Sequence, residues 1–393
     1  MVSRLAAEHP SALAYLRAAG EEPLSEELRS QCELAEEVAR PLRGTAGAAL
    51  WRRRGQAAWG LARGIPRWAE EWWVADYANR VRELAARWRP DLVHVHYSLM
   101  GRYLPALAAC TAPRVLVVYE PGASRAVDDY REAPRSVRRL SSRLDAAVWR
   151  RFERKVVRDV SAAVVFTERD RAAIDRLGTP TPTHVIPFGV TVPEQPSSID
   201  SDGETVVFVG SFDHRPNVAA AIALARDIFP RVQATRPSAK LQIVGAGPPN
   251  ELRALAGDGV EVTGPVQDVA PYLDRAAVYV APLRLGGGMR VKVAEALAAG
   301  KAVVATSLAV EGLEVTNGRE LLVAETDEEL ADATAGLLAN RERRRALELR
   351  AHAWAVDHLG WERPIEAYRR LHAELLGAGS AVPAEADHGD VPR

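Results

Sequence analysis

Residues 282–312, PLRLGGGMRVKVAEALAAGKAVVATSLAVEG, have the sequence pattern of a βαβ unit. The glycines of this unit allow a ligand to approach the backbone closely, and the start of the helix behind them offers unpaired N–H groups. The pattern predicts a buried strand over 278–281, a turn at Gly286, Gly287 and Gly288, a helix over about 289–299 that ends at Gly300, and a second strand over 302–306.

Two cations, Arg290 and Lys292, fall in the first turn of this helix. Cations at a helix N-terminus act against the helix dipole, so an anion bound between them is a physical reason for their presence. Glu295 lies on the same helical face as Lys292 and is placed to accept hydrogen bonds from sugar hydroxyls. Together these residues indicate a nucleotide-diphosphate ligand. A tight strand-to-helix turn with solvated basic residues is the alternative interpretation.

The rest of the second half of the chain resembles a known family. From Thr205 to about Leu376 the sequence is similar to the nucleotide-sugar domain of the retaining GT-B glycosyltransferases called glycosyltransferase family 4, and GGGMRVK resembles one branch of that family. The matching segments, in order, are VVFVGSFDHRPN (206–217), AKLQIVGAGPP (239–249), the stretch from Val260 to Thr306, VEGL (310–313) and Trp361 in a terminal helical stretch. The resemblance implies an α/β fold with two Rossmann-like, doubly wound domains that face a cleft.

Composition agrees with a two-domain globular protein. The chain has 393 residues, of which 47% are hydrophobic and 26% charged. A net charge of −1 gives no reason to expect a nucleic-acid partner. Cys32 and Cys110 provide neither a disulfide framework nor metal-site spacing. Because no apolar run is long enough to span a bilayer and no signal peptide is visible, we expect a cytoplasmic protein.

The expected domain organisation follows from the linker EQPSSIDSDGE, which lacks apolar periodicity. We expect an acceptor-side domain over 1–193, a linker over 194–204, a nucleotide-sugar domain over 205–360, a helix over 361–376 that crosses back to the first domain, and a disordered tail over 377–393.

The first residues predict the end of a helix over 2–9, a short strand over 11–17 and an acidic helical stretch over 21–38. The resemblance implies an earlier first strand and a glycine-rich loop, and the N-terminal domain lacks both. In a doubly wound sheet that strand lies in the middle, so its absence leaves neighbouring strands without partners. We expect that the start is misplaced or truncated, or that another segment fills the gap.

Aromatic and histidine residues of the first domain have structural and functional interpretations. Tryptophans between Trp51 and Trp88 include the helical pair Trp68 and Trp72, which favours core packing over an acceptor platform. His94 and His96 point to the same face of the predicted strand PDLVHVHYS. The VHVH strand resembles one that is common in the family, and the resemblance implies that these histidines pack beside the interdomain cleft. No further ligand of suitable spacing is visible, so a metal site is not favoured.

The strand RVLVVY (114–119) ends at Tyr119 and Glu120, where doubly wound sheets place their ligands. Family members often carry a histidine near this position, and Tyr119 stands in its place. We expect Tyr119 to hydrogen-bond a sugar and Glu120 to act as an acceptor-positioning base. A further strand is expected over 161–171.

The stretch RSVRRLSSRLDAAVWRRFERKVVRD is basic and amphipathic, with Leu140, Leu144, Val148 and Phe152 at intervals of four. One interpretation is weak contact of this helix, near residues 135–158, with an anionic membrane surface or a phosphorylated acceptor. The other, which we favour, is a surface helix whose leucines face the core and whose arginines are solvated.

The donor domain departs from the family pattern at three positions. The resemblance implies an arginine and a lysine that hold the donor phosphates, where this chain has Ser211 and Pro216. It also implies an acid eight residues before Glu295, where this chain has Gly287. Phosphate binding is therefore assigned to Arg290 and Lys292, with help from Arg215 or the helix N-terminus near Asn217.

Further donor contacts are expected where the strands end. Backbone groups of Thr263 and Val266 should face the nucleobase, Glu311 should lie on the diphosphate side, and Asp268 should cap a helix. The remaining expected donor-binding residues are Gly210, Ser211, Gly245, Gly286, Gly287, Gly288 and Met289.

By resemblance, the reaction moves a sugar from a nucleotide-diphosphate sugar to an acceptor hydroxyl with retention of configuration. Lys292, Arg290 and the helix N-terminus are expected to stabilise the leaving diphosphate. No Asp-x-Asp metal clamp is visible, so neither a metal nor a cofactor is expected. A nucleotide-sugar epimerase and a non-catalytic partner of another transferase are the alternatives; donor binding without turnover would identify the latter.

Overall fold

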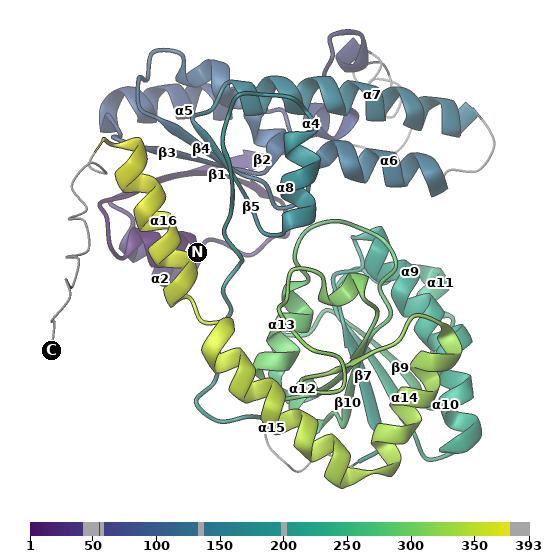
Figure 1. Cartoon of the computed structure of the whole chain (residues 1–393). Helices are drawn as coiled ribbons and strands as arrows, with labels where there is room; N and C mark the ends of the chain where they lie inside the picture. The colour runs from purple at the N-terminus through teal and green to yellow at the C-terminus, as the bar shows by residue number, and fades with distance from the viewer. Residues whose placement is uncertain (42–54, 56–58, 133–136, 198–202, 378–393) are drawn as a thin grey trace, which may run out of the picture.

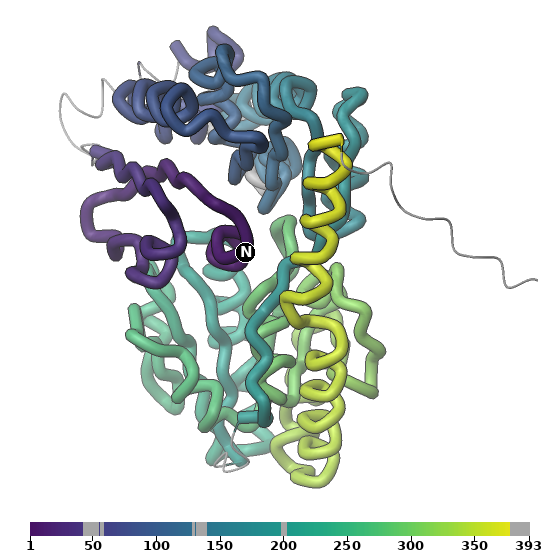
Figure 2. The backbone as a smooth tube through the Cα atoms, turned by 90° about the vertical axis from the view of Figure 1, so that its left-hand side faces the viewer, coloured from purple at the N-terminus to yellow at the C-terminus, as the bar shows by residue number. Residues whose placement is uncertain are grey.

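The computed structural model describes residues 1–41, 55, 59–132, 137–197 and 203–377. Parallel strands covered by helices make up two domains, and the last helices of the chain run along both (Figures 1 and 2). The expected disordered tail falls almost wholly outside the described residues.

The sheet of the C-terminal domain reverses its strand order at β7. Among the described residues it has six parallel strands in the order β12-β11-β10-β7-β8-β9. Ligands of open α/β sheets bind at such a switch point, beyond the carboxyl ends of the strands. The topology therefore brings together Gly210, after β7, and the glycine loop after β10. The strands are β7 (Thr205–Val209), β8 (Lys240–Val244), β9 (Val260–Gly264), β10 (Val278–Ala281), β11 (Ala302–Ala305) and β12 (Leu322–Val323).

Helices cover this sheet on both sides, and α13 (Val291–Ala298) begins directly after the glycine loop, two residues later than predicted. Gly300 has φ +69°, which agrees with its predicted place at the helix end. Asp268 caps the start of α12 as predicted, because its Oδ1 accepts from the Ala270 N–H at 2.9 Å. The other helices are α9 (Arg215–Ala223), the π-helix η2 (Leu224–Ile228), α10 (Phe229–Thr235), α11 (Asn250–Arg253), α12 (Ala270–Arg275), η3 (Leu308–Val310), α14 (Asp327–Ala339) and α15 (Arg341–His358).

The described strands of the N-terminal domain form two separate parallel sheets. One has four strands in the order β3-β4-β5-β6, and the other pairs β1 only with β2. Strand pairing among the described residues is thus interrupted between β1–β2 and β3–β6, and the expectation about the start of the chain stays a prediction. The strands are β1 (Ala12–Ala18), β2 (Leu34–Arg40), β3 (Val93–His96), β4 (Arg114–Val117), β5 (Ala162–Val165) and β6 (Thr183–Val185).

The helices of this domain are α1 (Val2–Ala6), α2 (Glu26–Gln31), α4 (Arg67–Glu71), α5 (Ala75–Trp88), the 3-10 helix η1 (Ser98–Leu107), α6 (Gly122–Glu132), α7 (Val137–Arg158) and α8 (Glu168–Asp175). Two predictions are wrong here. The acidic helix over 21–38 is only the short α2, and strand β2 follows because parallel pairing with β1 overrides helix propensity. The strand expected over 161–171 ends at Val165, because Thr167 caps α8.

The favoured interpretation of the basic helix is also wrong in part. Phe152 is buried, but Leu140 is 59% exposed and Leu144 is 55% exposed, so these leucines do not face the core. Core packing is confirmed for Trp68 and Trp72, while Trp59 is 65% exposed and Trp51 lies outside the described residues.

The last helix, α16 (Glu362–Leu375), packs against the N-terminal domain (Figure 1). His372 Nε2 lies 2.9 Å from His94 Nε2 of β3, and Arg369 pairs with Glu8 at 2.6 Å. Across the described part of the chain, no helix is long and apolar enough to cross a membrane.

Candidate active site at the glycine loop

The glycine loop between β10 and α13 touches the N-terminal domain. Gly286 has φ +97° and Gly288 has φ +74°, conformations that favour glycine. A Cβ atom at Gly288 would overlap the carbonyl oxygen of Tyr119. Glycine is therefore needed here both for the turn and for the approach of the two domains.

Carboxylates of the N-terminal domain accept hydrogen bonds from this loop. The Gly287 N–H donates to Glu120 Oε1 at 3.0 Å, and the Gly288 N–H donates to Asp170 Oδ1 at 3.4 Å. Glu120 follows strand β4 and Asp170 lies in the first turn of α8. The loop thus presents N–H groups that bind anionic oxygens, which is the property that a phosphate site requires.

Arg290 lies against the loop from the other side. Its guanidinium donates to the carbonyl oxygen of Gly286 at 2.8 Å and also to those of Gly287 and Gly288. Burial lowers the pKa of this guanidinium, and the neighbouring Glu120, Glu311 and Asp170 act in the opposite direction. Arg290 therefore holds the loop in shape, and its predicted contact with a phosphate stays a prediction.

Lys292 and Glu295 lie on the exposed side of α13. Their side chains form an ion pair at 2.8 Å and are 49% and 39% exposed. An exposed ion pair of this kind contributes little to stability. The two side chains thus share one face of α13, as the sequence predicted, and binding of a ligand by Lys292 stays a prediction.

Two residues of α8 that the sequence analysis missed join the site. Arg169 forms an ion pair with Glu311 at 2.9 Å and donates to the Gly286 carbonyl at 3.3 Å. Burial raises the pKa of Asp170, against the effect of hydrogen bonds from Thr167 and Gly288. The spacing of Thr167 and Asp170 is a capping signal that would have revealed the helix start, although not its contact with the loop.

The other predicted donor residues gather at the carboxyl ends of the strands. A Cβ atom at Gly245 would overlap the Gly210 carbonyl, so these two loops touch. Asn217 Nδ2 donates to the Ser211 carbonyl at 2.8 Å, at the start of α9 near Arg215. Thr263 is the last residue but one of β9 and its hydroxyl donates to the Gly264 carbonyl at 2.8 Å, and Val266 follows the strand. Met289 is buried under the loop.

Tyr119 is held within the N-terminal domain. Its hydroxyl lies 3.3 Å from His96 Nδ1, and its ring stacks on Tyr97 with centroids 4.2 Å apart. Burial raises the pKa of Tyr119 to about 12, with a smaller contribution from Tyr97. The hydroxyl is therefore a neutral hydrogen-bonding group and not a base.

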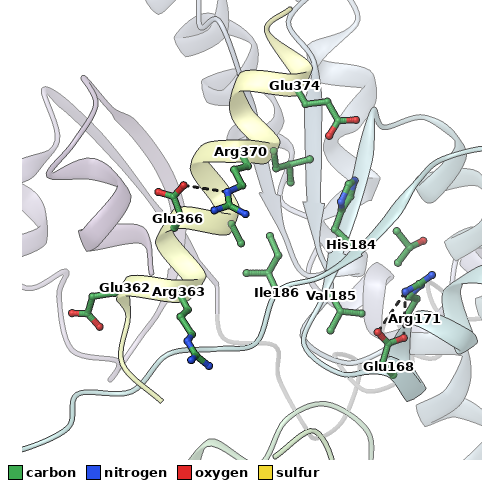
Figure 3. A pocket seen from close by; sticks show the side chains of 13 residues that line it. Glu168, Arg171, His184, Val185, Ile186, Glu362, Arg363, Glu366, Arg370 and Glu374 are labelled. Atoms are coloured by element: carbon green, nitrogen blue, oxygen red, sulfur yellow. Dashed lines mark hydrogen bonds and ion pairs between the residues drawn. The ribbon is translucent and has the colours of Figure 1, made fainter. Parts of the chain in front are cut away.

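A separate pocket of about 780 Å³ lies between α16, β6 and α8 (Figure 3). Its charged side chains include the pairs Glu168 with Arg171 and Glu366 with Arg370. None of the predicted site residues lines this pocket. No group of three or more His, Cys, Asp or Glu side chains is arranged for a metal within the described ranges.

Comparison with known proteins gives this geometry a family context. Residues 203–340 match the family model of the glycosyl transferases group 1, and residues 22–189 match that of the glycosyl transferase 4-like domain. The two matched regions are thus similar, one after the other along the chain, to the two kinds of domain that these glycosyl transferase models describe. Phosphatidyl-myo-inositol mannosyltransferase of Mycolicibacterium smegmatis is 31% identical over 188 residues, which cover 46% of this chain and 48% of that protein.

Further similarities agree with this assignment. The Mycobacterium leprae protein of the same name is 34% identical over 190 residues, 46% of this chain and 49% of its own length. The chain thus spans about half the length of these curated relatives. Among solved structures, sucrose-phosphate synthase from Thermosynechococcus elongatus has a TM-score of 0.64 at 18% identity, covering 94% of this chain and 100% of that chain.

HepE from Anabaena, in complex with UDP and glucose, has a TM-score of 0.64 at 13% identity and covers 94% of this chain and 100% of its own. These similarities confirm the predicted GT-B fold. The matched models and relatives are transferases, so the comparisons do not favour the epimerase or the non-catalytic interpretation.

Proposed function

We propose that this protein transfers a glycosyl group from a nucleotide-diphosphate sugar to an acceptor hydroxyl, with retention of configuration and without a divalent metal. The observation that carries the proposal is the glycine loop at the switch point of the C-terminal sheet, whose N–H groups already bind two carboxylate oxygens. A donor diphosphate offers oxygens of the same kind.

The chemistry then depends on stabilising the leaving diphosphate. Negative charge grows on the diphosphate as the glycosidic bond breaks. The Lys292 ammonium, in the first turn of α13, and the N–H groups of the loop before it would stabilise this charge. Arg290 keeps the loop carbonyls in place so that its N–H groups face the ligand. Fixed cations take the place of a metal ion in this scheme.

The identities of the donor and the acceptor are to be found by screening. HepE was solved in complex with UDP-glucose, and the mannosyltransferase relatives are named for phosphatidyl-myo-inositol, so UDP-sugars and inositol lipids enter the first screen. We expect one nucleotide class among UDP-, GDP-, dTDP- and ADP-sugars to raise the melting temperature, because a ligand of the folded state stabilises it. The same shift is expected with EDTA.

The acceptor screen follows with the donor that binds. Release of nucleotide that depends on an added hydroxyl acceptor would support transfer. A well-folded sample that no donor stabilises would contradict the proposal, and donor binding without turnover on any acceptor would favour a non-catalytic partner.

We extend the proposal to a weak contact with the anionic inner face of a membrane. Leu140 and Leu144 project from α7 at 59% and 55% exposure, and the exposed charged side chains of the same helix include Arg143, Arg150 and Arg154. Apolar side chains beside cations suit an anionic lipid surface. The supporting result is sedimentation with phosphatidylglycerol vesicles but not with phosphatidylcholine vesicles.

The control for this contact is an exposed apolar pair on α15. Leu349 and Val356 are 47% and 55% exposed. Replacing Leu140 and Leu144 by aspartate should abolish sedimentation, whereas the same change at Leu349 and Val356 should not. Equal loss in both variants would contradict a contact through α7.

A further inference from the structure

Tyr97 is an exposed aromatic residue in a strained backbone conformation. It directly follows β3, has φ +70° and ψ 133°, and is 46% exposed. A bulky residue at positive φ is a genuine outlier, and such residues persist only where the surrounding structure holds them. Here the Tyr97 N–H donates to the Val117 carbonyl at 2.9 Å, which fixes the residue at the end of the sheet.

The ring of Tyr97 lies flat on the ring of Tyr119. Their centroids are 4.2 Å apart and the planes differ by 16°. Tyr119 is held in turn by Phe166, edge to face at 5.2 Å, and by His96 at its hydroxyl. The stack is therefore rigid on the Tyr119 side and open to solvent on the Tyr97 side.

This stack stands next to the glycine loop. The Tyr119 carbonyl abuts Gly288, and the Glu120 carboxylate that follows it in the chain accepts from Gly287. Both tyrosines lie beyond the carboxyl ends of neighbouring parallel strands, β3 and β4, where α/β sheets bind ligands. The exposed Tyr97 ring thus stacks on Tyr119, and Tyr119 contacts the glycine loop that is assigned to the donor.

We propose that the Tyr97–Tyr119 stack is a platform for a ring-shaped polyol acceptor, a sugar or a cyclitol. The face of an aromatic ring carries negative charge and attracts the C–H hydrogens on the apolar face of such a ring. The Glu120 carboxylate beside the stack offers an acceptor for its hydroxyls. This inference rests on the proposed function, because it names the substrate that receives the sugar.

Saturation-transfer NMR on the full chain tests the platform. The probes are methyl α-D-mannopyranoside and myo-inositol, with glycerol as an acyclic control. We expect transfer to the ring protons of both cyclic probes in the wild type and in Tyr97→Phe, and none to glycerol. In Tyr97→Asn, which tolerates positive φ but lacks the ring, the transfer should fall by about three-fold or more.

Trp59→Ala is the matched control, because Trp59 is an exposed aromatic residue outside the stack. Its transfer should equal that of the wild type. Undiminished transfer in Tyr97→Asn, or no transfer to either cyclic probe in the wild type, would overturn the platform. UDP binding by thermal shift on the same samples reports separately on the donor site, so failure of the proposed function is distinguishable from failure of the platform.

Discussion

The backbone N–H of Gly287 donates a hydrogen bond to Glu120 Oε1, 3.0 Å away, across the junction between the two domains. Beside it, the Gly288 N–H donates to Asp170. In this state the carboxylates of one domain use the N–H groups that a phosphate bound by the other domain would need. Under the proposed function, donor binding would therefore compete with contacts between the domains.

Removal of the Glu120 carboxylate should favour the nucleotide. Glu120→Ala frees the Gly287 N–H and removes a negative charge from the loop, and a hydrogen bond to a charged group has a net value of about 1.5–3 kcal/mol. We expect the dissociation constant of UDP, or of the nucleotide class that binds, to fall by roughly ten- to hundred-fold in isothermal titration calorimetry.

The control is Glu168→Ala on α8. The Glu168 side chain is 73% exposed and pairs with Arg171, away from the loop. Its replacement should leave nucleotide affinity unchanged. Weaker binding in Glu120→Ala would show that this carboxylate assists the donor instead of competing with it.

Replacement of Lys292 tests its proposed contact with the leaving diphosphate. Lys292→Ala should lower the rate of sugar transfer by one to several orders of magnitude, because a cation that stabilises the leaving diphosphate acts most strongly in the transition state. Little stability should be lost, since the ion pair of Lys292 with Glu295 is exposed. Nucleotide release under saturating donor measures the rate.

Lys240→Ala is the comparison variant, because Lys240 is an exposed lysine at the start of β8 in the same domain. It should retain the wild-type rate. Transfer at the wild-type rate in Lys292→Ala would remove the assignment of this residue to the diphosphate.

Alanine substitutions at Gly288 and Gly318 distinguish the effect of backbone strain from the effect of the contact between the two domains. Both have positive φ, +74° and +81°, so alanine at either position costs about 1–2 kcal/mol. Only at Gly288 would the new Cβ atom also overlap the Tyr119 carbonyl, whereas Gly318 has open space around it. Gly288→Ala should therefore push the loop away from the N-terminal domain.

We expect Gly288→Ala to lower the transfer rate by about ten-fold or more, as a small displacement of reacting groups does. Gly318→Ala should lower only the melting temperature. Equal rates in the two variants would show that the contact of the loop with Tyr119 has no part in transfer.

Local sequence signals predicted the βαβ unit well, because the glycines, the buried strands and the helix end at Gly300 each depend on nearby residues. They did not predict β2, whose acidic sequence favours a helix until it pairs with β1. The exposure of Leu140 and Leu144 was also missed, since periodicity gives the apolar face of a helix but not what covers it.

In the candidate site, too, local contacts could be predicted from the sequence and long-range contacts could not. Lys292 and Glu295 share a helix, so their spacing alone places them together. Tyr97 meets Tyr119, and Asp170 meets the loop, through the pairing of β3, β4 and β5, and no local pattern specifies these contacts. The bonds from the Arg290 guanidinium to three carbonyl oxygens of the turn were not predicted either, because they depend on the folded shape of the loop.

The histidines beneath the stack give the protein a pH dependence with a definite sign. Burial lowers the pKa of His96 to about 4 and that of His94 well below its ordinary value. In the unfolded chain both titrate near pH 6.5, so between about pH 6.5 and pH 4 the unfolded state binds more protons. The free energy of unfolding is therefore not reduced by these histidines above this range. It falls as the pH decreases through the range, by on the order of 1 kcal/mol per pH unit for each histidine.

His96→Asn isolates one part of this dependence. The melting temperature of the wild type should fall between about pH 7.5 and pH 5.5. That of His96→Asn should fall by less over the same range. At pH 7.5 the melting temperature of the variant should already be lower than that of the wild type, because the contact with Tyr119 is lost. His214→Asn, at an exposed histidine before α9, should keep the wild-type pH dependence. The decisive comparison is the slope and not the midpoint, because loss of packing alone lowers the melting temperature equally at both pH values. An unchanged slope in His96→Asn would place the acid sensitivity elsewhere.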